Sequence, residues 1–81
     1  MKIVWDEPKR IANLAKHGID FADIGEEFFA SAIIRPAKNG RLAAFGWLDD
    51  AVAVIFVTLG SEAISIVSAR PANRKEKVLY L

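Results

Sequence analysis

The chain has 81 residues with no cysteine, and 53% of its residues are hydrophobic. A chain this short forms one domain, residues 1–81, and without cysteine it has no disulfide and no thiolate metal site. The formal net charge of +1 excludes a polycationic protein, so nucleic acid would have to be bound by a local basic patch.

The N-terminal residues predict a short strand and a first helix. Residues 3–5 form an apolar edge strand, and the acidic residues that follow exclude a signal peptide. Asp6 and Pro8 suit the start of a helix, because an acidic cap and an early proline both fit its first turn. Gly18 ends that helix, since glycine adopts the left-handed conformation without a steric penalty. No apolar run reaches membrane-spanning length, so we expect a cytoplasmic protein without membrane contacts.

A second helix is expected to begin at Asp20. Its apolar residues recur at the spacing of one buried helix face. The members of this stripe are Phe21, Ile24, Phe28 and Phe29. We expect them to lie in the core.

Short turns divide the remaining chain into antiparallel strands, because such turns join only antiparallel neighbours. The strands are residues 31–35, 41–48, 51–59 and 63–69. Asn39-Gly40 is a hairpin signal, and Trp47 is expected in the core beside Phe45. The third strand is apolar on both faces, so both faces need cover. The helices cover one face, and the other meets the terminal helix, a second subunit or another protein.

The fourth strand ends in Arg70, and a short helix capped by Asn73 follows as far as Tyr80. A guanidinium at a strand end suits a phosphate, because it is permanently charged and binds oxyanions in a bidentate fork. Glu76 and Tyr80 lie four residues apart and share a helix face. The alternative is a solvated charged face in which Glu76 pairs with Arg70 or Lys77.

His17 is the only histidine, which excludes a multi-histidine metal site. The helix dipole favours its protonated form, which suits either a general acid or a residue that only satisfies terminal carbonyls. Lys9 and Lys16 extend a basic edge along the same helix. With Arg41 and Arg70 at strand ends, these groups suit RNA cleavage without a metal, in which cations stabilise the phosphorane while a base and an acid move protons. No phosphate-binding or dinucleotide-binding loop is present, so no cofactor is expected.

Several short motifs are spread along the chain. The N-terminal ones are Trp5-Asp6-Glu7, Lys9, Asn13, Lys16-His17-Gly18-Ile19 and Phe21. The later ones are Phe28 or Phe29, Arg41, Gly46, Ile66, Ser68-Ala69-Arg70, Ala72, Glu76 and Tyr80. Each motif is weak alone, but the combination is specific, covers essentially the whole chain and resembles the BrnT-type toxin family.

The resemblance implies an α+β protein with a RelE-like fold: two N-terminal helices, a four-stranded antiparallel sheet and a short C-terminal helix. It implies the toxin of a type II toxin–antitoxin pair, an endoribonuclease that reduces translation by cutting RNA. The implied partner is a ribbon-helix-helix antitoxin of the BrnA type, through which the complex binds operator DNA. The high apolar fraction also suits a homodimer or a hetero-oligomer.

Site residues are expected on this basis. The expected catalytic residues are His17, Arg41, Arg70, Glu76 and Tyr80, and the expected RNA-binding residues are Lys9, Lys16, Arg74 and Lys77. Arg41 and Arg70 would stabilise the phosphate, and His17 or Tyr80 would act as the acid. Glu76 would act as the base or would orient an arginine.

Two positions depart from the family pattern. Asn39-Gly40 precede Arg41 where many members have an acidic residue, and Ser65 stands where many have arginine. Fewer charges weaken phosphate contact, so a non-catalytic RelE-like scaffold that binds an antitoxin or nucleic acid is the alternative. One open cleft containing His17, Arg41 and Arg70 would favour the enzyme, and three separate surfaces would favour the scaffold.

Overall fold

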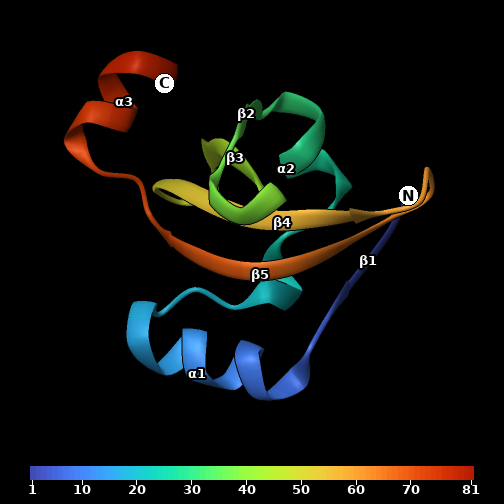
Figure 1. The fold of residues 1–81 in the computed structure, drawn as a ribbon. Coiled ribbons are helices and arrows are strands. Elements are labelled where there is room, and N and C mark those ends of the chain that lie inside the picture. The colour runs from blue at the N-terminus through green and yellow to red at the C-terminus, as the bar shows by residue number, and fades with distance from the viewer.

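A computed structural model describes residues 1–81 as one twisted sheet with helices on both of its faces (Figure 1). The strands are β1 (Lys2–Trp5), β2 (Ile33–Pro36), β3 (Leu42–Trp47), β4 (Ala51–Leu59) and β5 (Ala63–Pro71). The helices are α1 (Glu7–His17), α2 (Glu26–Ser31) and α3 (Arg74–Tyr80), with 3-10 turns at Phe21–Asp23 and Lys38–Gly40. None of these helices combines the length and apolar character needed to cross a membrane.

The sheet has five strands in the order β1-β5-β4-β3-β2, and the prediction of a four-stranded antiparallel sheet is therefore wrong in part. The last four strands do pair antiparallel as expected. The difference is β1, which pairs with β5 in parallel, from Lys2 opposite Ala63 to Trp5 opposite Ile66. Parallel neighbours need a long connection, and here most of the chain lies between them.

The predicted second helix is broken into two short pieces. Asp20 caps only the 3-10 turn, with its carboxylate accepting from Ala22 N. The chain is extended at Ile24 and Gly25, and α2 starts afterwards. The apolar stripe is buried nevertheless, with Phe21, Ile24 and Phe28 at most 5% exposed. The break follows from Gly25, because glycine is a poor residue inside a helix and a good one before its first turn.

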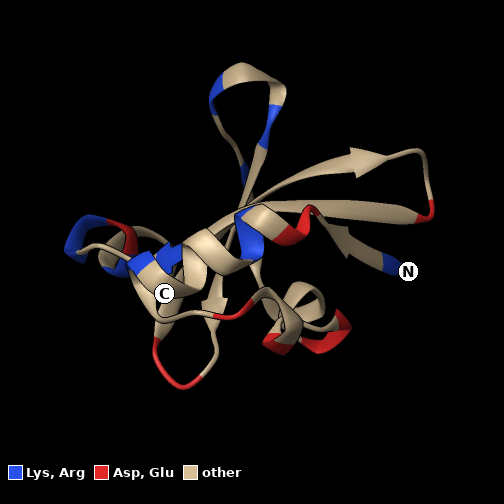
Figure 2. Cartoon of the chain, turned by 90° about the horizontal axis from the view of Figure 1, so that it is seen from below, with Lys and Arg blue, Asp and Glu red and all other residues tan.

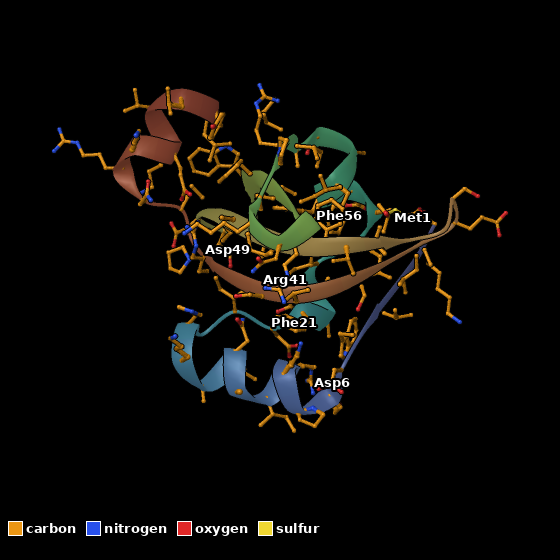
Figure 3. All side chains as sticks on the ribbon, in the orientation of Figure 1. Met1, Asp6, Phe21, Arg41, Asp49 and Phe56 are labelled. Carbon is orange, nitrogen blue, oxygen red and sulfur yellow. The ribbon has the colours of Figure 1, made fainter.

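The main core lies between the sheet and the N-terminal helical elements. It contains Phe21, which lies between α1 and the sheet (Figure 3), together with Val54 and Ile66. Gly46 of β3 allows α2 to approach closely, because a Cβ there would lie 2.9 Å from Cε1 of Phe28. The close contact explains a glycine in the middle of a strand.

The opposite face of β4 is covered by α3, one of the three alternatives predicted for it. Ala43, Phe45 and Ala53 form a second buried cluster there, against which Tyr80 packs. The cover is incomplete, because no residue of α3 is buried and Trp47 is 59% exposed. Trp47 was expected in the core, but β2 starts at Ile33, opposite Phe45, and does not extend alongside it.

Candidate functional site

Arg70, Glu76 and Tyr80 meet where α3 lies against the sheet. The Nη1 and Nη2 atoms of Arg70 donate to the two carboxylate oxygens of Glu76 at 2.7 and 2.8 Å. Glu76 also accepts from the backbone N of Asn73, while the Asn73 side chain accepts from the backbone N of Glu76. This capping box fixes the first turn of α3, so the carboxylate that helps to cap the helix also binds the arginine.

The ion pair sets the charge state of both partners. The hydrogen bond from Arg70 lowers the pKa of the Glu76 carboxyl, although partial burial acts in the opposite direction. The same hydrogen bond raises the pKa of Arg70. Side-chain exposures of 35% for Arg70 and 14% for Glu76 place the pair at the edge of solvent. A carboxylate with a lowered pKa is a weak base, because general-base catalysis works best with a pKa near the working pH.

Tyr80 is held by an aromatic stack and a cation. Its ring stacks on Phe45 with centroids 4.5 Å apart, and the guanidinium carbon of Arg35 lies 5.4 Å from its centroid. A nucleotide base would have to compete with these contacts for the ring. These contacts engage the ring of Tyr80 and do not involve its hydroxyl.

Arg35 was missed by the sequence reasoning, although the strand register puts it on the same face as Arg70. Arg35 pairs with Ala43 on β3, next to the row that joins Phe45, Ala53 and Arg70. Its signal in the sequence is period-two alternation, because Arg35 lies two residues after Ile33 and so points to the same face. We call Arg35, Phe45, Arg70, Glu76 and Tyr80 the α3 cluster.

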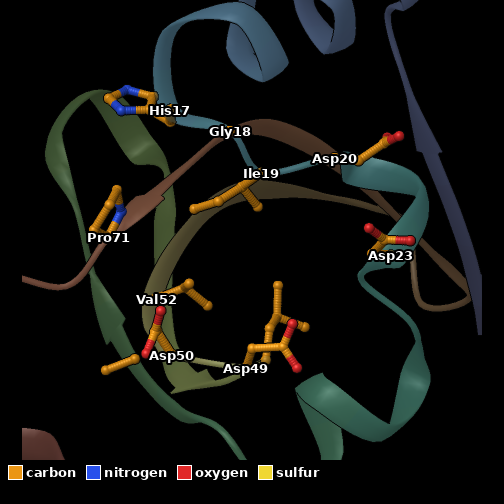
Figure 4. A pocket seen from close by; sticks show the side chains of 11 residues that line it. His17, Gly18, Ile19, Asp20, Asp23, Asp49, Asp50, Val52 and Pro71 are labelled. Carbon is orange, nitrogen blue, oxygen red and sulfur yellow. The ribbon is translucent and has the colours of Figure 1, made fainter.

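His17 lines a different site, a pocket of about 460 Å³ on the other side of the β5–α3 connection (Figure 4). Its polar lining is acidic, and the charged residues are Asp20, Asp23, Asp49 and Asp50. Arg10 binds both oxygens of Asp20 at 2.8 and 3.0 Å, which lowers the pKa of that carboxyl. A pocket with this charge repels phosphate.

Arg41 belongs to neither site, although Ala43, two residues later, pairs with Arg35. It precedes β3, whereas the acidic Asp49–Asp50 turn follows that strand, and six residues of strand span about 20 Å. Figure 2 shows the β2–β3 turn projecting from the body of the protein with Lys and Arg along it. The structure thus does not bring His17, Arg41 and Arg70 into one cleft, and this is the arrangement expected for the scaffold alternative.

The predicted RNA-binding residues fall into two groups. Arg74 and Lys77 are exposed on α3, near the α3 cluster, whereas Lys9 and Lys16 are exposed on α1, across the sheet. Lys and Arg residues at the end of α1 and the start of α3 lie toward the same end of the molecule (Figure 2). No group of three or more His, Cys, Asp or Glu side chains is arranged to hold a metal ion.

Comparison with known proteins identifies the family. Residues 5–76 match the family model of the ribonuclease toxin BrnT of type II toxin–antitoxin systems. The fold is similar to the crystal structure of the Brucella abortus ribonuclease toxin BrnT, with a TM-score of 0.85 and 54% identity. That match covers 91% of this chain and 99% of the Brucella chain. A search of curated proteins gave no match. The chain belongs to the BrnT family of ribonuclease toxins of type II toxin–antitoxin systems.

Proposed function

We propose that this protein is a metal-independent endoribonuclease toxin that inhibits translation, and that it cuts RNA at the α3 cluster. The observation that carries the proposal is the partly buried guanidinium of Arg70, held in a fixed orientation by two bonds to Glu76. Cleavage through the 2′-hydroxyl needs preorganised cations around the phosphorane, and such groups contribute most when they are already oriented.

The roles follow from the geometry. Arg70 stabilises the charge that develops on the phosphate, and Arg35 assists from the same sheet face. Glu76 orients Arg70, because its lowered pKa makes it a poor base. The 2′-hydroxyl gives its proton to solvent as its oxygen attacks the phosphorus, and the hydroxyl of Tyr80 protonates the leaving 5′-oxygen. Solvent then returns a proton to Tyr80. Arg74 and Lys77 contact the RNA backbone from the exposed side of α3.

His17 and Arg41 receive lesser roles than the sequence suggested. Arg41 lies in the projecting β2–β3 turn and contacts RNA away from the reacting phosphate. His17 lines a pocket in which the charged residues are aspartates, and it takes no part in the chemistry proposed here.

Toxins of type II systems act with an antitoxin, and we propose a ribbon-helix-helix protein of the BrnA type as the partner. The exposed apolar residues of α3 support a protein partner at this end, since Val78 is 78% and Leu79 is 58% exposed. An antitoxin bound there would also cover the α3 cluster. Operator DNA would be bound through the antitoxin.

A non-catalytic scaffold is the second candidate, and two observations favour it. The first is that His17, Arg41 and Arg70 do not share one cleft. The second is that both outer nitrogens of Arg70 donate to Glu76, so a phosphate at Arg70 would lie next to a resident carboxylate. The scaffold function predicts RNA binding or antitoxin binding without cleavage.

Cleavage of a fluorescently labelled single-stranded RNA of mixed sequence by the purified protein decides between the two. We expect cutting by the wild type in the presence of EDTA, and at least a hundredfold loss for Arg70→Ala, since single charge-stabilising donors contribute about that much. Lys2→Ala, which removes a cation from the far edge of the sheet, is the matched control. Intact RNA with the wild type, or equal cutting by Arg70→Ala, would contradict the proposal.

A further inference from the structure

Asn13 is the only polar side chain among the buried residues, and it is 8% exposed. It belongs to α1, which lies alongside β5 (Figure 1). Its Nδ2 donates to the carbonyl oxygens of Ile19 and Ala69 at 3.0 and 2.9 Å. Its Oδ1 accepts from the backbone N of Ala69 at 3.1 Å and from Oγ of Ser68 at 3.4 Å. Both donors and both acceptor positions of the amide are therefore used.

The two bonds to Ala69 are those that a neighbouring strand would make. β1 pairs with β5 only as far as Ile66, so beyond that residue the outer edge of β5 has no strand partner. The Asn13 amide takes the place of a peptide group there and satisfies both backbone groups of Ala69. Buried backbone groups without a partner are costly, which explains why this apolar interior contains one asparagine.

The segment held in this way carries Arg70. A register irregularity lies just before it, because Ser68 pairs with Ile55 while Ile66 pairs with Phe56. After this bulge, β5 is bounded by β4 on one side and by Asn13 on the other. Ala69 immediately precedes Arg70, so the Asn13 amide holds the backbone next to Arg70 on the side opposite β4.

We infer that Asn13 is a positioning residue for RNA cleavage, acting through Ala69 on Arg70. The inference rests on the function proposed above. The Asn13 side chain makes no hydrogen bond to a residue of the α3 cluster. Its effect on Arg70 therefore passes through the backbone of β5. Displacement of a catalytic group by about 1 Å lowers the rate by about a hundredfold, which is the scale of effect expected here.

Asn13→Asp and Asn13→Leu test the inference. On the labelled single-stranded RNA of mixed sequence, we expect kcat to fall by roughly tenfold to a hundredfold in both at neutral pH, with a smaller change in KM. The protonated carboxyl of Asn13→Asp has one donor and one acceptor and so reproduces both bonds to Ala69. Burial raises the pKa of such a carboxyl. The activity of Asn13→Asp relative to wild type should therefore rise as the pH falls, whereas that of Asn13→Leu should not.

At each pH, the activity of Asn13→Asp is divided by that of wild type. This cancels the effect of neighbouring charged groups, because both proteins contain them. These groups are Lys16 and His17 on α1, Asp20 after it, and Arg70 with Glu76 across β5. Phe29→Leu is the stability control, because Phe29 packs on Phe56 in the core, away from Asn13. We expect it to lower the melting temperature and to leave kcat within about twofold of wild type.

A second readout needs no RNA. In ¹⁵N-resolved NMR spectra of the free protein, the Ala69 amide and the Arg70 Nε–H should shift in Asn13→Asp at neutral pH and return toward wild-type positions on acidification. If the Asp and Leu variants do not fold, Asn13→Gln keeps the amide one methylene further from the backbone, and the same Arg70 shift is expected.

Unchanged kcat in the Asn13 variants, a pH-independent Asn13→Asp ratio, or unmoved Arg70 resonances would overturn the inference. Absence of cleavage by the wild type would instead contradict the proposed function, and the NMR shifts would still decide whether Asn13 positions Arg70.

Discussion

Glu76 binds Arg70 through two parallel hydrogen bonds while its own backbone N is held by the side chain of Asn73. One carboxylate thus joins the end of β5 to the start of α3. Because the contact is bidentate, it fixes the plane of the guanidinium as well as its position. A phosphate that approaches Arg70 meets a donor already oriented, but it must compete with a resident carboxylate.

Replacement of Glu76 separates its two possible roles. In Glu76→Gln we expect RNA to bind more tightly, because a negative charge next to the phosphate is removed, and kcat to fall because Arg70 is less firmly oriented. The acid limb of the kcat–pH profile should persist, since the lowered pKa argues against Glu76 as the base. Fluorescence anisotropy of labelled RNA with wild type and with Glu76→Gln, both of which retain Arg70, gives the RNA affinity. Cleavage rates from pH 4 to 9 give the kcat–pH profile. Disappearance of the acid limb would make Glu76 the base.

The same ion pair makes stability depend on pH. The pKa of Glu76 is lowered from its ordinary value of 4.5 in the folded protein, so its stabilising contribution is present above about pH 4.5. That contribution is lost as the pH falls through the lowered value. We expect the difference in melting temperature between wild type and Glu76→Gln to shrink on acidification below pH 4.5.

Two other carboxyls titrate in the same range. The pKa of Asp20 is lowered by Arg10, and that of Glu26 is lowered by the N-terminal ammonium group. Both remain in Glu76→Gln, so the difference between the two melting curves isolates Glu76. A difference that stays constant from pH 7 to pH 3 would show that the Arg70–Glu76 pair adds nothing to stability.

Local sequence patterns were sufficient for most of the individual elements. The sequence predicts β4 with its observed bounds, the left-handed Gly18 at the end of α1 and the Asn73 cap of α3. Each depends on residues within a few positions of one another. The parallel pairing of β1 with β5 has no such signal, because the paired residues Trp5 and Ile66 are distant in sequence. The turns between them do not indicate which strand β1 will join.

Arg41 does not join Arg70 for a reason already present in the predicted topology. Arg41 begins the second predicted strand and Arg70 ends the fourth. Strands β3 and β5 both run antiparallel to β4, so the start of one and the end of the other lie at opposite ends of the sheet. Residues at strand ends are neighbours only when the strand directions bring those ends together. Arg35, inside β2, was the arginine that the register brings onto the face of Arg70.

Gly46 is expected to be intolerant of a side chain. In Gly46→Ala the added Cβ would lie 2.9 Å from Cε1 and 3.2 Å from Cζ of Phe28, both in a buried ring. Overpacking of this kind costs about 1–3 kcal/mol, and urea denaturation measures it. Gly25→Ser is the matched control, because a Cβ there meets nothing within 4 Å and serine is a favoured cap. Equal stability of Gly46→Ala and wild type would show that α2 shifts without cost.

Two substitutions of Tyr80 distinguish the packing of its ring from the chemistry of its hydroxyl. Tyr80→Phe keeps the ring that stacks on Phe45 at 4.5 Å, so the free energy of unfolding should change by less than about 0.5 kcal/mol. Tyr80→Ala removes that ring from the cluster of Ala43, Phe45 and Ala53, and we expect a loss of about 2 kcal/mol. If the hydroxyl is the general acid, Tyr80→Phe should still lower kcat by about a hundredfold or more.

An RNA with a different leaving group tests whether the fall of kcat in Tyr80→Phe is due to lost proton transfer. An RNA analogue with a 5′-phosphorothiolate linkage has a sulfur leaving group that needs no proton, so an acid contributes nothing to its departure. We therefore expect Tyr80→Phe and wild type to cut this analogue at similar rates, while Arg70→Ala remains defective on it. Equal losses for Tyr80→Phe on the natural and the modified RNA would show that the hydroxyl binds the substrate and does not protonate the leaving oxygen.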